Sequence, residues 1–200
     1  DSPGAGVGDL APGQSVTVLP YFNCGTCVAC RKGRPNACRN NQTMGVQREG
    51  AMSEYVCVPR RQVIPVEGLR QRDLALIEPI AVGFHAAARA NIQPGESVAV
   101  VGLGGVGLAA LLGAVAAGAT EIVAVDLSDD KLAIARDLGA TRTYNAKEPG
   151  LVERIRTETG GGVDHAVELA GAVPAFELAY KITRRGGQTV TAGLAAPSAE

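Results

Sequence analysis

The chain has 200 residues, of which 46% are hydrophobic and 20% are charged, and its formal net charge is −1. These values are ordinary for a soluble globular protein of one large or two modest domains, and they argue against disorder. Aromatic residues make up 4% and no basic stripe is present, so we exclude nucleic acid as the main partner. The apolar stretch 98–119 is interrupted by glycines and is interpreted as a buried strand, loop and helix rather than a membrane span.

The first part of the chain, to about Pro65, is rich in Gly and Pro and contains short runs typical of strands. Strands are predicted over residues 15–19, 54–58 and 62–66. This pattern indicates a small, irregular β domain. Cys57, which lies in the second of these runs, is interpreted as a small buried core residue.

Four of the five cysteines lie within fifteen residues, with two, two and seven residues between successive members. Four thiolates at this spacing can converge on a tetrahedral zinc ion, about 2.3 Å from each sulfur. A zinc ion with four protein ligands has no position left for water or substrate, so a structural zinc is predicted. The predicted ligands are Cys24, Cys27, Cys30 and Cys38.

Two other uses of clustered cysteines remain open. Disulfides are disfavoured because nothing at the N-terminus resembles a signal peptide, and clustered cysteines in a non-secreted chain favour metal. An iron–sulfur cluster is disfavoured because the ferredoxin run has a shorter last gap and a Pro after its final cysteine, where this chain has Arg39. The basic segment 31–35 would lower the pKa values of the four thiols and offset the charge of a tetrathiolate zinc site. A solvated loop is the alternative interpretation of these cations, and both can hold.

From Ser97 onward, apolar strands alternate with amphipathic helices, which predicts a parallel sheet with helices on both faces. Strands are predicted over residues 97–101, 121–125, 141–144, 163–169 and 188–192. Helices are predicted to begin near Val106, Asp129, Gly150 and Pro174. Ser128 is predicted to cap the second helix, with its hydroxyl accepting a hydrogen bond from the amide of Lys131.

A glycine-rich turn directly follows the first of these strands and matches the G-x-G-x-x-G pattern of dinucleotide-binding folds. In that pattern the glycines permit a tight turn, close approach of the backbone to a pyrophosphate, and packing of the helix on the strand. The residues are Gly102, Leu103, Gly104, Gly105, Val106 and Gly107. Because such turns also serve plain packing, the motif needs support from its context.

An acidic residue, Asp126, ends the next strand nineteen residues after Gly107. A carboxylate at this place can accept hydrogen bonds from the ribose hydroxyls of adenosine and repel a 2′-phosphate, which predicts NAD rather than NADP. The alternative is an Asp that only opens the turn before Ser128. Lys131 is interpreted as a ribose contact, with a solvated helix residue as the alternative.

Together, the cysteine cluster, the glycine-rich turn and Asp126 resemble the zinc-dependent medium-chain alcohol dehydrogenases over essentially the whole chain. Residues 78–82, Glu-Pro-Ile-Ala-Val, resemble the crossing into the cofactor domain in the polyol, threonine and sugar-acid dehydrogenases of that family. The resemblance implies part of a β-rich GroES-like catalytic domain over residues 1–77, with the zinc lobe at 24–38. A doubly wound, α/β NAD-binding Rossmann domain would then occupy residues 78–200.

The resemblance also implies a function, which is hydride transfer to NAD from the secondary alcohol of a polyol or of a sugar acid such as a hexonate. Such an enzyme would hold a structural and a catalytic zinc. Glu78 would lie at or beside the catalytic zinc, and the alternative is a carboxylate favoured by the helix dipole. His85 is interpreted as a core residue, and His165 supports no functional role. A cytoplasmic homo-oligomer, a dimer or tetramer with a small-molecule substrate and no membrane contact, is expected.

The family's remaining catalytic-zinc ligands, a cysteine and a Gly-His-Glu motif, are expected upstream of residue 1, and a sixth strand is expected after the fifth. The chain is therefore expected to be an internal segment of a longer enzyme and to be inactive alone. One alternative is a zinc-stapled NAD-binding or assembly module without catalysis. A zinc-free quinone-reducing relative is disfavoured because those enzymes generally lack the four-cysteine lobe.

Overall fold

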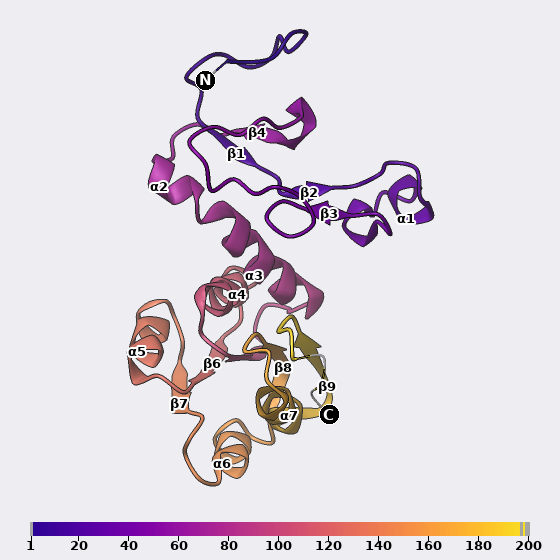
Figure 1. Cartoon of the computed structure of the whole chain (residues 1–200). Helices are drawn as coiled ribbons and strands as arrows, with labels where there is room; N and C mark the ends of the chain where they lie inside the picture. The colour runs from indigo at the N-terminus through magenta and orange to yellow at the C-terminus, as the bar shows by residue number, and fades with distance from the viewer. Residues whose placement is uncertain (1, 197, 199–200) are drawn as a thin grey trace. The chain divides into compact units, whose positions relative to one another are not determined.

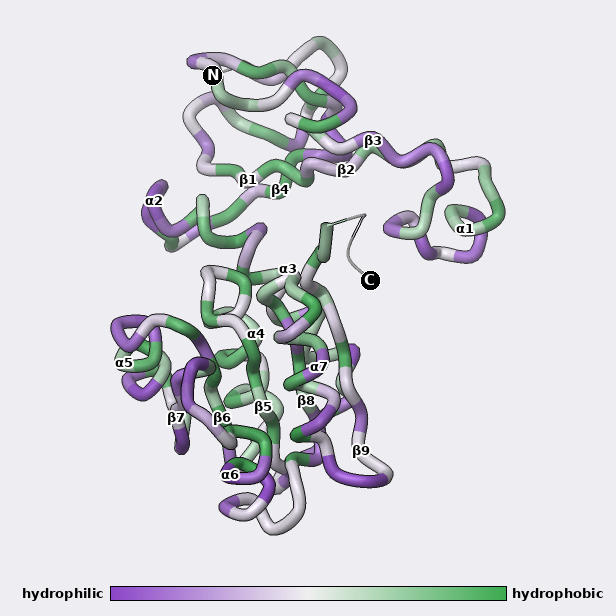
Figure 2. The backbone as a smooth tube through the Cα atoms, turned by 60° about the horizontal axis from the view of Figure 1, so that its bottom comes forward, coloured by the Kyte–Doolittle hydropathy of each residue, from purple (hydrophilic) through white to green (hydrophobic). Residues whose placement is uncertain are grey.

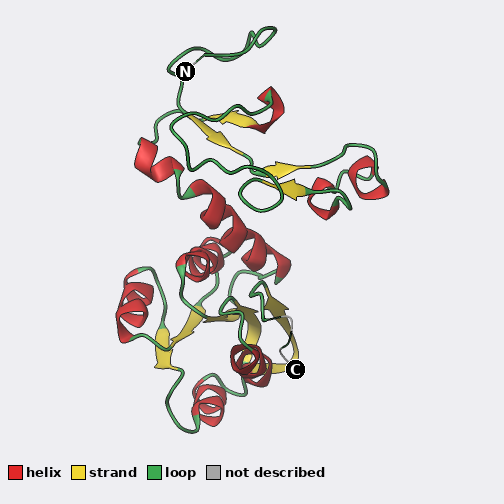
Figure 3. Ribbon diagram, viewed as in Figure 1, coloured by secondary structure: helices red, strands yellow, loops and turns green. Residues whose placement is uncertain are grey.

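The computed structural model describes residues 2–196 and 198. Two compact units make up the chain, Asp1–Ile77 and Glu78–Glu200, and each is described by itself. Loops dominate the first unit, whereas helices and strands alternate in the second (Figure 3). Within the described residues, no helix is long and apolar enough to cross a membrane.

The first unit contains two pairs of short antiparallel strands (Figure 1). One pair joins β1 (Val16–Val18) to β4 (Val63–Pro65), with Val16 opposite Pro65. The other joins β2 (Tyr21–Phe22) to β3 (Gln42–Thr43). The predicted strands over 15–19 and 62–66 are therefore present in shortened form.

Short helical turns fill the connections of this unit: α1 (Val28–Arg31), η1 (Pro35–Ala37), η2 (Arg60–Gln62) and α2 (Gln71–Leu74). Gln62 is buried at the end of η2, and its side-chain amide donates hydrogen bonds to the carbonyl oxygens of Leu19 and Tyr21. These bonds hold the segment between β1 and β2 against the start of β4. A buried amide needs such partners, since an unsatisfied one is costly.

The strand predicted over residues 54–58 does not form. That segment is a loop without a partner strand, so the alternation of its side chains does not place every second one in a core. Cys57 is exposed, and its interpretation as a core residue is therefore wrong.

The second unit is built on a five-stranded parallel sheet in the order β7-β6-β5-β8-β9. The strands are β5 (Ser97–Val101), β6 (Glu121–Asp126), β7 (Arg142–Asn145), β8 (Val163–Glu168) and β9 (Thr183–Thr191). The helices are α3 (Ile77–Arg89), α4 (Gly105–Ala116), α5 (Asp129–Asp137), α6 (Leu151–Glu158) and α7 (Val173–Ile182). This confirms the predicted doubly wound sheet, with β9 starting earlier than predicted.

Both faces of the sheet are covered by apolar side chains. Val98 and Val100 of β5 belong to a core with α3, α4 and α5, whereas Ala99 and Val101 belong to a core with α6 and α7. Successive side chains of a strand point to opposite faces, so a strand covered on both sides must be apolar throughout. Figure 2 shows this as a largely green tube through β5.

Two details of the helices differ from prediction. Ser128 occupies the N-cap position of α5, but its hydroxyl makes no capping hydrogen bond. Its amide instead donates to Asp126 Oδ1 at 3.0 Å. His85 is exposed rather than in the core, because the buried face of α3 carries Gly83, Ala86 and Ala87 and the helical period turns His85 away from it.

A carboxylate ties together the amino-terminal ends of β5 and β8. Asp164 Oδ2 accepts hydrogen bonds from the amide of Ser97 at 2.8 Å and from its hydroxyl at 2.7 Å, and Oδ1 accepts one from Arg184 at 2.5 Å. Burial raises the pKa of Asp164, but the hydrogen bonds from Ser97 and Arg184 outweigh it and hold the pKa below its usual value.

We expect this carboxylate to stabilise the fold at neutral pH and to stop doing so in acid. Because its folded pKa lies below the unfolded pKa of about 3.9, the contribution is fully present above the unfolded pKa and is lost as pH falls through the folded one. Asp164→Asn should lower the free energy of unfolding by about 1–3 kcal/mol at pH 7. Denaturant unfolding at a series of pH values checks this, and a difference from the unaltered chain that stays constant into acid would contradict it.

Candidate functional site

The four predicted cysteine ligands meet in the long loop between β2 and β3. The pairing of β2 with β3 brings the two ends of this loop together. Within the loop, Cys27 is the N-cap residue of α1, Cys30 lies inside α1, and Cys38 directly follows η1. The four sulfur atoms all lie within 4.8 Å of one another.

The spacing of the sulfurs fits a tetrahedral zinc ion. A Zn–S bond of about 2.3 Å places two ligand sulfurs about 3.8 Å apart, and the sulfurs of Cys24 and Cys38 are 3.6 Å apart. Backbone amides of Cys24 and Asn40 donate to the Cys38 sulfur at 3.3 and 3.4 Å, and the Cys27 amide donates to the Cys24 sulfur at 3.4 Å. Such donors favour thiolates. All five cysteines are free thiols, so this donor set suits zinc.

The cysteine thiols of the lobe differ in pKa. Backbone hydrogen bonds, first from Thr26 and then from Cys27, lower the pKa of Cys24 to about 5. Burial is the main cause that raises the pKa of Cys30 to about 12. Because a metal is bound by thiolates, loading the lobe should release the proton of Cys30.

The glycine-rich turn has the geometry that its sequence pattern predicts. Gly102 has a φ of +94°, and a Cβ there would lie 2.6 Å from the amide nitrogen of Ala170. A Cβ at Gly107 would collide with the carbonyl oxygen of Gly102, so the close packing of α4 on β5 also requires glycine. Gly104 and Gly105 face open space, since a Cβ at either position would meet no atom within 4 Å. The turn therefore leaves room for a ligand group beside the start of α4.

Asp126 joins this turn to α5. Its Oδ2 accepts a hydrogen bond from the Leu103 amide at 2.7 Å, its Oδ1 accepts one from the Ser128 amide, and the amine of Lys131 lies 3.7 Å from Oδ1. The structure thus brings together Leu103, Asp126 and Lys131, which were predicted separately. The carboxylate is held in one orientation at the end of β6.

A cavity of about 1070 Å³ opens at these residues. It lies at the carboxyl-terminal edge of the parallel sheet, where open α/β sheets bind their ligands. The glycine-rich turn, the end of β6 and the loops after β7 and β8 form its walls. Its lining includes Gly102, Leu103, Gly104, Asp126, Lys131, Leu169 and Ala170.

Comparison with known families matches both units. The family model described as "Alcohol dehydrogenase GroES-like domain" matches residues 1–68, and "Zinc-binding dehydrogenase" matches residues 105–200. The chain belongs to the zinc-dependent medium-chain alcohol dehydrogenases. This confirms the family to which the cysteine cluster, the glycine-rich turn and Asp126 pointed.

Curated dehydrogenases of this family resemble the chain along nearly all of its length. Sorbitol dehydrogenase of Bacillus subtilis is 39% identical over 194 residues, which are 96% of this chain and 55% of the relative. L-galactonate-5-dehydrogenase of Escherichia coli is 36% identical over 196 residues, which are 96% of this chain and 56% of the relative. The chain therefore spans about half the length of the curated relatives it matches.

Solved structures agree with the fold. Galactitol-1-phosphate dehydrogenase from Escherichia coli has a TM-score of 0.90 and 33% identity, over 98% of this chain and 57% of that one. A zinc-binding dehydrogenase from Sinorhizobium meliloti, solved bound to NADP, has a TM-score of 0.94 and 33% identity, over 100% of this chain and 59% of that one.

Glu78, the residue predicted for catalysis, lies exposed in the first turn of α3. Among the described residues, the four cysteines are the one group of His, Cys, Asp and Glu side chains close enough to hold a metal ion. Glu78 is outside that group, so its role beside a catalytic zinc stays a prediction.

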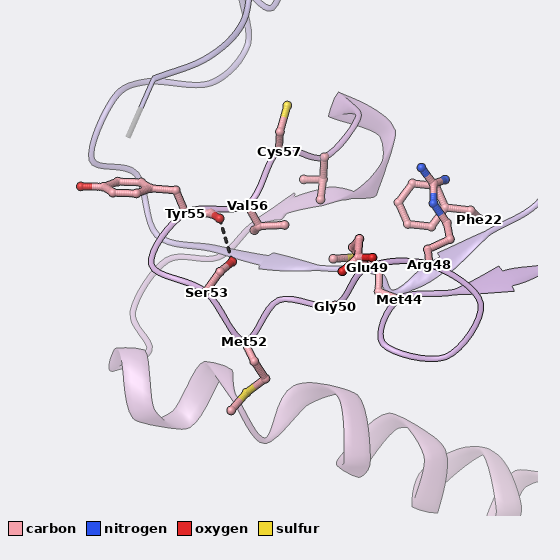
Figure 4. A pocket seen from close by; sticks show the side chains of 11 residues that line it. Phe22, Met44, Arg48, Glu49, Gly50, Met52, Ser53, Tyr55, Val56 and Cys57 are labelled. Atoms are coloured by element: carbon pink, nitrogen blue, oxygen red, sulfur yellow. Dashed lines mark hydrogen bonds between the residues drawn. The ribbon is translucent and has the colours of Figure 1, made fainter.

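A second cavity, of about 770 Å³, lies in the first unit along the loop over residues 44–58 (Figure 4). The guanidinium of Arg48 lies over the ring of Phe22, 4.0 Å from its centre, and the Ser53 hydroxyl donates to the Tyr55 carbonyl at 2.7 Å. No role was predicted for these residues from the sequence. Within the described part of the chain, this cavity holds no cluster of metal-binding groups.

One buried acidic residue beside the first cavity was not predicted from the sequence. Glu168 ends β8 and its side chain is 2% exposed. Its sequence context, Glu-Leu-Ala-Gly directly after an apolar strand, was the available signal, since buried carboxylates need local hydrogen-bond donors.

Proposed function

We propose that this chain carries the structural zinc lobe and the NAD site of a dehydrogenase that oxidises a secondary alcohol of a polyol or sugar acid. The observation that carries the proposal is the Asp126 carboxylate, which is held by two backbone amides and lines the cavity beside the glycine-rich turn. The named activities of the relatives, sorbitol and L-galactonate-5-dehydrogenases, support the substrate class.

Each group at the site has a defined task in this proposal. The amides at the start of α4 bind the pyrophosphate, for which Gly104 and Gly105 leave space. Asp126 accepts hydrogen bonds from the adenosine ribose, with Lys131 beside it. The lobe cysteines hold zinc as a structural staple. When bound, NAD supplies the hydride acceptor, and a catalytic zinc, with Glu78 at or near it, supplies polarisation of the alcohol oxygen.

We further propose that the whole enzyme is a cytoplasmic homo-oligomer, a dimer or tetramer, acting on a small molecule. The near-neutral net charge of −1 supports a partner other than nucleic acid or an anionic membrane surface. Sedimentation of the whole protein tests the oligomeric state.

The coenzyme preference is testable by titration calorimetry. We expect NAD to bind at least about tenfold more tightly than NADP, because the oriented Asp126 carboxylate repels a 2′-phosphate. Asp126→Asn should lose most of this preference. The matched control, Asp130→Asn, removes an equal charge from an exposed position in the first turn of α5 and should keep the preference for NAD. Equal or tighter binding of NADP by the unaltered chain would contradict the proposal.

The second candidate is an NAD-binding or assembly module that is stabilised by zinc and has no catalytic activity. The cysteine cluster also favours this candidate, because four cysteine ligands would leave a zinc ion no position for substrate. Metal analysis and NAD-reduction assays over a panel of polyols and aldonates, carried out on the whole protein, separate the two. Two zinc ions per chain with activity support the dehydrogenase, whereas one zinc ion with NAD binding and no hydride transfer supports the module.

A further inference from the structure

Glu168 is a buried carboxylate that organises the loop after β8. Its Oε1 accepts hydrogen bonds from the amides of Ala170 at 2.8 Å and Gly171 at 2.7 Å. Its Oε2 accepts one from the hydroxyl of Thr191, at the end of β9, at 2.6 Å. A single side chain thus connects the loop after β8 to the end of the neighbouring strand.

The backbone around the Glu168 side chain is closely packed. A Cβ at Gly193 would lie 2.7 Å from Oε2, and a Cβ at Gly171 would lie 2.7 Å from the carbonyl oxygen of Leu194. The amides of Ala192 and Gly193 donate to the backbone carbonyl of Glu168 at 2.9 and 3.2 Å. The loop after β8 and the segment after β9 are therefore packed against each other around this carboxylate.

This loop is also a wall of the cavity. Leu169, Ala170 and Ala172 line it, and Ala170 packs directly on the glycine-rich turn, since a Cβ at Gly102 would lie 2.6 Å from the Ala170 amide nitrogen. Ala170 therefore forms part of the cavity wall on the β8 side of the glycine-rich turn, whereas Asp126 lies on the β6 side, because β5 is placed between β6 and β8. The hydrogen bond to Glu168 is what holds the Ala170 amide in place.

We propose that Glu168 is a positioning residue for the cofactor, which fixes the wall over residues 169–172 against the glycine-rich turn; this rests on the NAD site proposed above. Among the described residues it forms no ion pair, and its three hydrogen bonds come from two amides and a hydroxyl. The role of Glu168 is therefore to supply hydrogen-bond acceptors, in a fixed orientation, to these two amides and this hydroxyl. A glutamine can supply the same contacts, because its amide oxygen accepts from both backbone amides and its amide nitrogen donates to the Thr191 oxygen.

The test compares the variants Glu168→Ala, Glu168→Gln and Asp164→Ala of the full chain by NAD titration. Each titration is carried out at a temperature well below the midpoint of thermal unfolding of that variant. Asp164 is the matched control because it makes comparable hydrogen bonds at the opposite end of the same strand, away from the cavity. Glu168→Ala should weaken NAD binding at least about tenfold, whereas Glu168→Gln should stay within about threefold of the unaltered chain. Asp164→Ala should lose stability and keep its NAD affinity.

Amide hydrogen exchange gives a readout that does not depend on NAD. The amides of Ala170 and Gly171 should exchange much faster in Glu168→Ala and remain protected in Glu168→Gln and Asp164→Ala. Unchanged exchange at these amides, an affinity loss equal to that of Asp164→Ala, or failure of Glu168→Gln to restore binding would overturn the inference. Absence of NAD binding in the unaltered chain would instead contradict the proposed function, with the exchange data still deciding the role of Glu168.

Discussion

A Cys38→Ser variant should lose the metal of the lobe over residues 24–38 and leave that lobe unfolded. Cys38 is buried, accepts hydrogen bonds from two backbone amides and lies within reach of the three other sulfurs. The lobe contains only the short turns α1 and η1, neither of which buries a side chain, so apolar packing contributes little to it. Structural zinc binding contributes about 10–16 kcal/mol of apparent free energy in small zinc domains, which exceeds any other stabilising term available here.

Zinc content of the purified chain and limited proteolysis of the lobe measure this effect. The control is Cys57→Ser, because Cys57 is exposed and lies outside the cluster. The unaltered chain and Cys57→Ser should each carry one zinc ion and resist cleavage in the lobe until a chelator is added. A zinc-free, protease-resistant unaltered chain would contradict the structural zinc, and iron with visible absorption would favour the iron–sulfur alternative.

Gly102→Ala should both destabilise the second unit and abolish NAD binding. The backbone at Gly102 has a φ of +94°, which costs a residue with a side chain about 1–3 kcal/mol. The new methyl group would also lie 2.6 Å from the Ala170 amide nitrogen, and such overpacking costs about 1–3 kcal/mol more. Relief of that collision would move Ala170, and with it the wall of the cavity.

Gly104→Ala is the matched variant, since it adds the same methyl group two residues along. A Cβ at Gly104 meets no atom within 4 Å, and its φ of −67° suits any residue. Its stability should therefore change by less than about 1 kcal/mol, while its NAD affinity falls because the methyl group enters the space left for the pyrophosphate. Denaturant unfolding and NAD titration separate the two variants, and equal stability losses would contradict the tight packing assigned to Gly102.

Prediction from sequence succeeded best where a segment's structure is decided by its own residues. The strand over 97–101 is followed at once by a glycine-rich turn, and the structure places both as predicted. The cysteine spacing likewise predicted convergence of the four sulfurs. In both cases the constraint is local, because the chain reaches its partner atoms within a few residues.

Prediction failed where burial depends on a distant partner. The run over 54–58 alternates like a strand, yet no other strand pairs with it among the described residues, and Cys57 is exposed. Similarly, the sequence around His85 is apolar, but the face of α3 that packs against α4 is set by Gly83, where a Cβ would lie 2.5 Å from the Cβ of Ala109. Which side of an apolar helix is buried depends on its neighbour.

The amino-acid sequence alone determined the family of this protein and predicted its cysteine cluster and glycine-rich turn, since each is encoded by the type and spacing of nearby residues. Only the tertiary structure decided that Asp126 accepts a hydrogen bond from the Leu103 amide, and that Glu168 connects the loop after β8 to Thr191 on β9. Those contacts join residues 23 positions apart in each case. They exist because parallel strands bring their carboxyl-terminal ends to one edge of the sheet, which no local pattern records.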